Sequence, residues 1–347
     1  MRGAWTLRRR GWSLAVRPRA AAAGSAIALA GLAAAVVSIG TGEFPMGPGQ
    51  VLRTLAGAGT PAEAFVVDQL RLPRVLTALL AGAALALSGA VFQSLVRNPL
   101  GSPDVLGFSQ GAATGALAAI TIGGGAAGAG AVAGGAAAGG IATGTAVWLL
   151  TRRTGSQGTR LVLTGIGVSA VATGITGYLL TRAQLLDAAR AVRWITGSLD
   201  GRGWSDVLSV GLPLVLLGGP VLACAGRTLR GLELGDDAAY GLGVRVERAR
   251  GALLAAAVLL AAAATAACGP VAFVALTAPQ LARRLTRAPG PNLAASALTG
   301  AALLTVADLL AQRIAPGREL PVGALTGVLG GGYLVGLLWA ERRRGRI

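Results

Sequence analysis

The sequence contains no histidine and no lysine, so all 31 of its basic residues are arginines, against 14 acidic residues. Without histidine, the chain has no histidine-dependent catalytic triad, no histidine metal ligand and no histidine-ligated haem. Without lysine, it has no phosphate-binding loop of the G-x-x-x-x-G-K-[ST] type and no lysine Schiff base. We therefore expect no ATP site of that type in this chain and no cofactor.

Charged residues are also scarce, at 13% of 347 residues, whereas a soluble domain carries about 25%. Two isolated cysteines, Cys224 and Cys268, lie in apolar runs, which is typical of small buried residues. Hydrophobic residues make up 53% of the chain and recur in runs of roughly 20 residues, the length of a membrane-spanning helix. The sequence therefore predicts an all-α polytopic membrane protein, and the net charge of +17 is better explained by membrane topology than by nucleic-acid binding.

About ten membrane-spanning helices are predicted from the apolar runs. They cover residues 20–39, 75–96, 105–122, 123–147, 161–180, 207–224, 253–268, 271–282, 293–310 and 322–339. The fourth run consists almost entirely of small residues with small-xxx-small spacing, which favours close packing against another helix. These limits divide the chain into a basic N-terminal segment (1–20), a transmembrane domain (21–340) and a short tail (341–347).

The distribution of arginine predicts the orientation of the chain. One set of connections, including both termini, holds 22 arginines and the other set holds nine. Because arginine-rich loops stay in the cytoplasm, we expect both termini to be cytoplasmic in a multi-pass protein of the cell membrane.

One polar stretch, residues 227–250, interrupts the apolar pattern with five arginines and four acids. Acids that follow a glycine suit the positive end of a helix dipole, and a later glycine suits the helix exit. This pattern predicts a short surface helix at 236–240. The stretch is either an ordinary solvated loop or a docking element for a soluble partner.

Four groups of motifs resemble, in order, the iron-siderophore and cobalamin permeases of ATP-driven importers. They are LRLPR with QSLVRNPLGSPDVLGFSQGA (70–112), LTGIGVS with WITGSL (163–199), LGDDAAYGLGV (234–244), and GPVAFV with APQLAR, ADLL and ELPVG (269–323). The resemblance implies the type II ABC importer permease architecture. It also implies two separate ATPase subunits inside, a second identical or homologous permease subunit, and a substrate-binding protein outside. The implied cargo is a ferric siderophore, with cobalamin and haem as alternatives.

The resemblance also implies roles for particular residues. A coupling element that contacts the ATPase would contain Gly235, Asp236, Asp237, Ala239, Leu242 and Gly243. Outer arginines that pair with glutamates of the binding protein would be Arg71, Arg74 and Arg313. The gate and pathway would include Gly158, Thr159 and Ser169. Where the family has histidine and a further arginine, this chain has Gln280 and Gln312, and Arg313 follows the latter.

Two other classes of protein remain as alternatives. A carrier driven by an ion gradient would need an ionisable residue within the membrane, and Asp308 is the candidate. We expect Asp308 to be a satisfied structural carboxylate near Arg313, close to the outer end of its span. A membrane enzyme is disfavoured because no acids are paired on one helix face. Gln93, Asn98 and Ser169, near or within spans, are expected to form hydrogen bonds between helices, with pore lining as the alternative.

Overall fold

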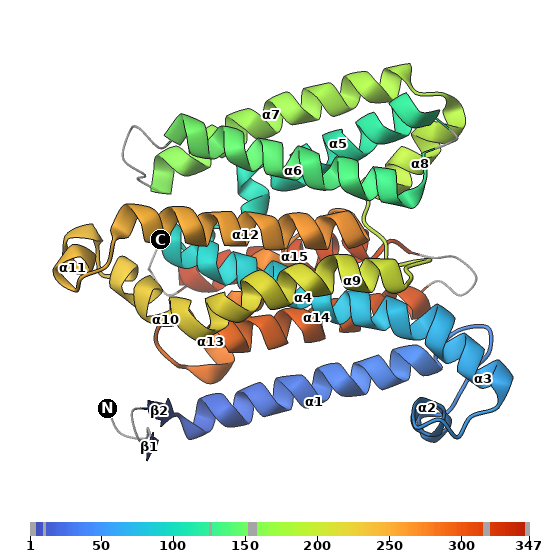
Figure 1. Cartoon of the computed structure of the whole chain (residues 1–347), viewed down its shortest axis with the longest axis horizontal. Helices are drawn as coiled ribbons and strands as arrows, with labels where there is room; N and C mark the ends of the chain where they lie inside the picture. Colours follow the sequence, from blue (N-terminus) through green and yellow to red (C-terminus); the bar gives the residue numbers. More distant parts are fainter. Residues whose placement is uncertain (1–4, 10–11, 125–126, 152–157, 315–319, 344–347) are drawn as a thin grey trace.

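Ten helical segments match the predicted spans, and most of them run roughly along the longest axis of the molecule (Figure 1). The computed structural model describes residues 5–9, 12–124, 127–151, 158–314 and 320–343. The ten segments are α1 (Pro18–Gly40), α4 (Leu72–Val96), α5 (Phe108–Gly123), α6 (Ala129–Thr151), α7 (Gly158–Arg182), α9 with α10 (Trp204–Pro213 and Gly219–Glu233), α12 (Val246–Cys268), α13 (Val274–Thr286), α14 (Leu293–Ile314) and α15 (Val322–Arg343). Shorter helices are α2 (Pro48–Leu55), α3 (Pro61–Phe65), α8 (Leu185–Ile195) and α11 (Asp236–Gly241).

The predicted helical membrane fold is confirmed. In the described part of the chain, seven helices are long and apolar enough to cross a membrane. The other three segments are shorter: α5 has 16 residues, α13 has 13, and the apolar part of α15 covers Val322–Gly336. A small antiparallel hairpin, β1 (Trp5–Arg9) with β2 (Trp12–Val16), lies in the basic N-terminal segment, where no strand was predicted.

The limits of α5 and α6 differ from the predicted spans. The prediction joined residues 105–122 directly to 123–147, but a 3-10 turn at Pro103–Leu106 and Gly107 precede α5. Gly124, at φ +54°, then ends α5, and α6 begins only at Ala129. Both glycines adopt left-handed backbone conformations, which break a helix whatever the hydrophobicity of the run.

Two of the spanning segments contain a π-helical turn, and each turn ends two residues before a proline. The first covers Val66–Arg71 and precedes Pro73, and the second covers Leu214–Gly218 and precedes Pro220. A proline ring clashes with the carbonyl four residues earlier and has no N–H to donate, so the preceding turn widens. α3 and α4 thereby form one continuous helical segment, Pro61–Val96.

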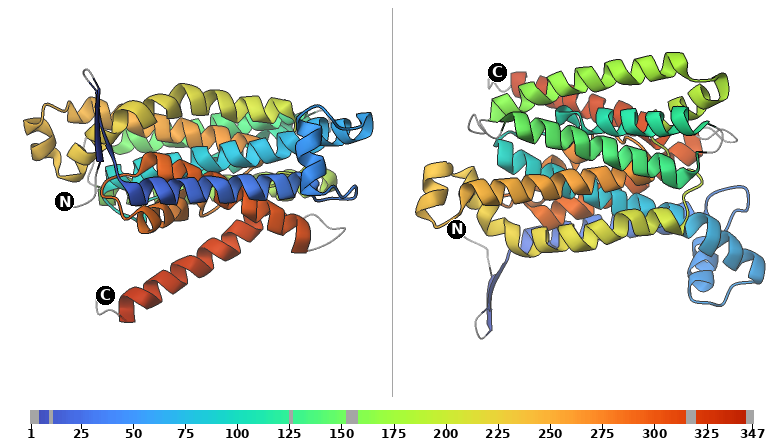
Figure 2. Two further views of the ribbon diagram at one scale, coloured as in Figure 1. Left: turned by 90° about the horizontal axis from the view of Figure 1, so that it is seen from below. Right: turned by 45° about the horizontal axis from the view of Figure 1, so that its top comes forward.

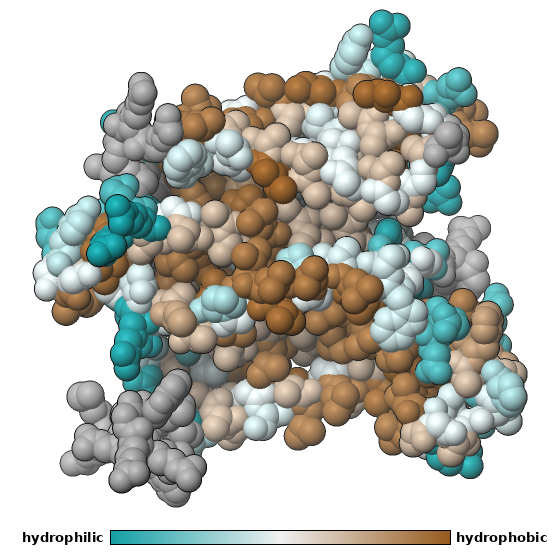
Figure 3. Space-filling view, viewed as in Figure 1, coloured by the Kyte–Doolittle hydropathy of each residue, from teal (hydrophilic) through white to brown (hydrophobic). Residues whose placement is uncertain are grey.

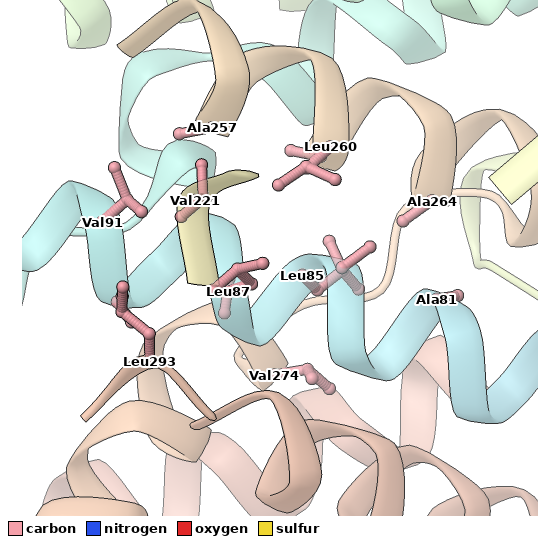
Figure 4. Packing of buried hydrophobic residues seen from close by; sticks show 14 of the residues in the cluster. Ala81, Leu85, Leu87, Val91, Val221, Ala257, Leu260, Ala264, Val274 and Leu293 are labelled. Atoms are coloured by element: carbon pink, nitrogen blue, oxygen red, sulfur yellow. The ribbon is translucent and has the colours of Figure 1, made fainter. Parts of the chain in front are cut away.

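α4 lies at the centre of the main core. Figure 4 shows its side chains Ala81 and Leu85 on the side of α12. Leu87 lies instead against the turn that joins α9 to α10. Val221 of α10 and Val274 of α13 join the same cluster. Most of α4 is buried, which makes it the element around which the other helices pack.

Glycines allow the backbones of α4 and its neighbours to touch. A Cβ atom added at Gly89 would lie 1.8 Å from the carbonyl oxygen of Ala275 in α13. Gly82 and Gly300 face each other in the same way between α4 and α14, with hypothetical Cβ atoms 2.2 to 2.3 Å from the opposite carbonyl oxygen. Neither interface has room for a side chain.

The glycine-rich helix α6 packs against α5. A Cβ at Gly115 would lie 2.0 Å from the Gly135 oxygen, and one at Gly139 would lie 2.1 Å from the Gly111 oxygen. The predicted close packing of this helix is confirmed at Gly135 and Gly139, and its partner, which the sequence left open, is α5. Gly134, in contrast, has open space around it.

Polar residues gather at the two ends of the molecule and apolar residues cover the middle (Figure 3). α2 and α3 lie at one end, whereas α11, β2 and the end of α15 lie at the other (Figure 1). Figure 2 shows α15 diverging from the other helices toward that second end. This arrangement suits a membrane-spanning chain with two water-facing ends.

Candidate functional site

The polar stretch 227–250 forms the tip of the molecule at one end (Figure 1). α10 ends at Glu233, α11 occupies Asp236–Gly241 and α12 follows from Val246, so the predicted short surface helix is confirmed. Gly235 (φ +118°) and Gly243 (φ +80°) flank α11 in conformations that other residues rarely adopt. The chain therefore depends on glycine for the turn on each side of α11.

The first residue of α11, Asp236, binds two guanidinium groups from different helices. Its Oδ1 accepts hydrogen bonds from Nη2 of Arg97 at 2.5 Å and from Nη2 of Arg250 at 2.8 Å. Arg97 is the C-terminal cap of α4, and Arg250 lies near the start of α12. Asp237, the next residue, is exposed and forms no ion pair with any described residue.

The two faces of α11 have different surroundings. Ala239 is fully buried and belongs to the main core cluster, so it holds α11 against the helix bundle. Leu242 is 67% exposed and Tyr240 is 55% exposed, and Leu234 just before α11 is 73% exposed. Of the six residues predicted to contact a partner, Ala239 faces inward, whereas Leu242 lies on an outward apolar face.

Arg71 is bound within the chain. Its Nη1 donates to the carbonyl of Ile39 and its Nη2 donates to the carbonyl of Phe44, both at 2.8 Å. These bonds hold the connection between α1 and α2 against the start of α4. Arg71 is thus engaged internally at the end of the molecule where docking was predicted.

Arg74 forms a buried ion pair across α4 and α14. Its Nε and Nη2 donate to the two carboxylate oxygens of Asp308 at 3.1 and 2.9 Å, and Asp200 lies 3.7 Å from Nη1. Asp308 is only 1% exposed and also accepts a 2.7 Å hydrogen bond from Gln312. Asp308 is therefore a satisfied structural carboxylate, as predicted, but its cationic partner is Arg74 rather than Arg313.

Arg313 is the most accessible of the three predicted docking arginines. It is exposed, and its one hydrogen bond among the described residues is a 3.4 Å contact from Nη2 to Thr41 Oγ1. A partner's carboxylate could approach Arg313 without breaking an ion pair with any residue that the structure describes.

The residues predicted for the gate and pathway lie on α7. Gly158 and Thr159 are its first two residues. Ser169 is half-buried and lies against the backbone of Gly107, so it packs α7 on the turn before α5. A broad apolar face of α7 remains exposed, with Leu163, Ile166, Val171, Ile175 and Tyr178.

The glutamines singled out from the sequence form helix contacts. Gln93 donates from Nε2 to the carbonyl of Leu276 at 2.9 Å and accepts from Arg283, which confirms its predicted bonding between helices. Gln280, where the family resemblance expects histidine, donates to the carbonyl of Pro99 at 2.8 Å. Asn98 instead accepts locally from the amide of Leu100, so its predicted contact between helices is wrong.

The order of these helices and motifs is shared with known transport proteins. Residues 26–340 match the FecCD transport family. The chain belongs to the FecCD transport family. The match covers every long helix from α4 to α14, together with α11.

Relatives of this FecCD-family chain span nearly its full length. It is 45% identical over 295 residues to the ferric enterobactin transport system permease protein FepG of Escherichia coli (strain K12), covering 85% of this chain and 88% of the relative. It is 34% identical to the cobalamin import system permease protein BtuC of Halobacterium salinarum, over 81% of this chain and 75% of the relative. A solved structure described as an inward-facing conformation of a metal-chelate type ABC transporter has a TM-score of 0.82 and 28% identity, over 91% of this chain and 98% of the other.

Sequence reasoning missed the partners of two key charges in this FecCD-family chain. Arg97 lies 139 residues before Asp236, and Arg74 lies 234 residues before Asp308. The available signal was that each of these charged residues lies at the end of an apolar run, where a charge needs a partner. That signal indicates that partners exist without identifying them.

Proposed function

We propose that this chain is the permease subunit of an ATP-driven importer that moves a ferric siderophore across the cytoplasmic membrane. The observation that carries the proposal is the near-full-length similarity to FepG, whose name specifies ferric enterobactin transport. Family membership and the multi-pass helical fold support the same reading.

The proposed complex contains two ATPase subunits, a second permease subunit and an extracytoplasmic binding protein. We place α11 and both termini on the cytoplasmic side, because the connections at that end carry most of the arginines. The ATPase subunits would contact the outward apolar face of α11 at Leu234, Tyr240 and Leu242. The exposed face of α7 would line the pathway or meet the second permease subunit.

A cobalamin importer is the second candidate, because a cobalamin permease is among the relatives. A gradient-driven carrier is disfavoured. Its expected signature is an intramembrane carboxylate that exchanges an ion, but Asp308 is held by Arg74 and Gln312.

The proposal is tested by uptake of iron-loaded siderophores in cells that lack this chain and in cells whose partner ATPase is inactivated. Uptake should fall at least about tenfold in both strains, because moving the polar groups of such a solute into hydrocarbon is costly. Labelled cobalamin serves as the matched substrate and should enter normally.

Two outcomes would contradict this assignment. Loss of cobalamin uptake with normal iron uptake would change the cargo while keeping the mechanism. Uptake that continues without an active ATPase would replace the importer with a gradient-driven carrier.

Reversal of the charge at Arg313 should weaken docking of the binding protein. We expect the Arg313→Glu variant to bind it roughly tenfold more weakly at low salt, with a smaller loss at high salt, because exposed ion pairs are screened. Titration of the binding protein against the complex in nanodiscs measures the effect. The Arg182→Glu variant is the control, since Arg182 is also exposed but stacks on Tyr178 at the end of α7. Equal losses of affinity in both variants would indicate a general effect of net charge rather than docking at Arg313.

A further inference from the structure

We propose that Asp236 is a positioning residue that clamps α11 to α4 and α12, rather than a residue that contacts the ATPase. This inference rests on the proposed function, because it concerns how motion of the ATPase reaches the membrane helices. The group formed by Arg97, Asp236 and Arg250 is called the arginine clamp below.

The clamp joins three separate elements at one oxygen atom. Asp236 Oδ1 lies 2.5 Å from Arg97 Nη2 and 2.8 Å from Arg250 Nη2. The Arg250 side chain is 13% exposed, and those of Arg97 and Asp236 are 43% and 42% exposed. A carboxylate shared by two arginines is held from two directions, so the two ion pairs together link α11 to both α4 and α12.

The backbone of Arg97 supports a role for its side chain. Arg97 adopts φ +53° at the C-terminal end of α4, a left-handed conformation that glycine adopts more readily at this position. In this geometry the Arg97 guanidinium reaches α11.

α11 has few other attachments to the bundle. The helix has six residues, and Gly235 and Gly243 on either side have open space around them. Ala239 is its buried apolar anchor, and Val244 donates its amide to the Ala239 carbonyl. A short helix between two glycines would pivot under load, and the clamp opposes that pivot.

The clamp connects α11 to a helix that lies mostly within the core. α4 extends over 25 residues from Leu72 to Val96, about 37 Å at the usual helical rise. At its far end, Arg74 is tied to Asp308 of α14. A displacement of α11 that moves Arg97 is therefore applied to the core of the bundle and not to a loose loop.

Asp236 and Asp237 provide a matched pair for the experiment. Both lie in the first turn of α11, but only Asp236 forms an ion pair with described residues. In the complete complex, the Asp236→Asn variant should bind its ATPase subunits normally but transport about fivefold or more less substrate per ATP hydrolysed. The Asp237→Asn variant should keep the parental ratio. Impaired ATPase binding by Asp236→Asn, or an unchanged transport ratio, would overturn the proposal.

A second measurement tests the clamp independently of transport. Hydrogen exchange over residues 227–250 of the isolated permease should accelerate in Arg97→Gln and in Asp236→Asn. The double variant should exchange no faster than Asp236→Asn alone, because that substitution already removes the carboxylate that Arg97 binds. Additive effects would overturn the clamp. If the clamp holds here while the parental complex transports no siderophore, the proposed function fails and the clamp stands.

Discussion

Among single substitutions at the outer arginines Arg71, Arg74 and Arg313, Arg74→Met should destabilise the protein most. Removal of one partner from a buried ion pair leaves the other charge without compensation, which costs about 3 to 5 kcal/mol. Asp308 is 1% exposed and receives both of its short arginine contacts from Arg74. Thermal unfolding of the purified permease, followed together with its amount in the membrane, measures the loss.

A second substitution should recover most of that stability. In the Arg74→Met/Asp308→Asn variant, no buried charge remains, and the asparagine can still accept the hydrogen bond from Gln312. The Arg53→Met variant is the control, since Arg53 is exposed at the same end, and its stability should stay within about 0.5 kcal/mol of the parent. A double variant no more stable than Arg74→Met would show that the pair itself is not the cause.

The Gly89→Ala variant should also be severely destabilised, although it adds a single methyl group. The new Cβ would lie 1.8 Å from the Ala275 carbonyl oxygen, and a backbone atom cannot move aside as a flexible side chain can. Overpacking of this kind costs about 1 to 3 kcal/mol, and more where the obstacle is backbone. α4 and α13 must separate to accommodate the methyl group.

Gly174→Ala is the matched control for this prediction. Gly174 lies in α7, and apart from the backbone of its own helix nothing lies within 4 Å of its added Cβ. Because alanine favours helix over glycine by up to about 1 kcal/mol, this variant should be as stable as the parent or more stable. The measurement is the unfolding temperature of both variants in one detergent. Similar temperatures for the two would mean that α4 and α13 are less closely packed than the structure shows.

Hydropathy predicts where the apolar helices lie, but it does not predict the backbone conformations that end or widen them. The apolar runs predicted the ten spans, and the acids between Gly235 and Gly243 predicted α11. The limits of α5 were missed because Gly107 and Gly124 adopt left-handed conformations that hydropathy does not register. The π-helical turns were missed for a related reason, since a proline alone does not specify how the preceding turn relaxes.

The structure adds internal contacts that the sequence could not supply for the predicted site residues. The resemblance placed Asp236 and Arg74 at opposite ends of the molecule, where the structure also has them. It could not indicate that each is bound within the chain, because their partners are brought near only when α4 packs against α12 and α14. The fold therefore changes the expected role of Arg74, whereas Arg313 keeps the accessibility that docking requires.

The close contact between α5 and α6 has a consequence for the order in which the protein assembles during synthesis. The two helices are neighbours in the sequence, and they touch through Gly111, Gly115, Gly135 and Gly139. Glycine and alanine lose no side-chain rotamer freedom when they pack, and contacts between neighbouring segments form early because little chain must be closed. This hairpin can therefore close as soon as α6 has entered the bilayer. The central helix α4 must wait for α12, α13 and α14 to be made before its own glycine and ion-pair contacts exist.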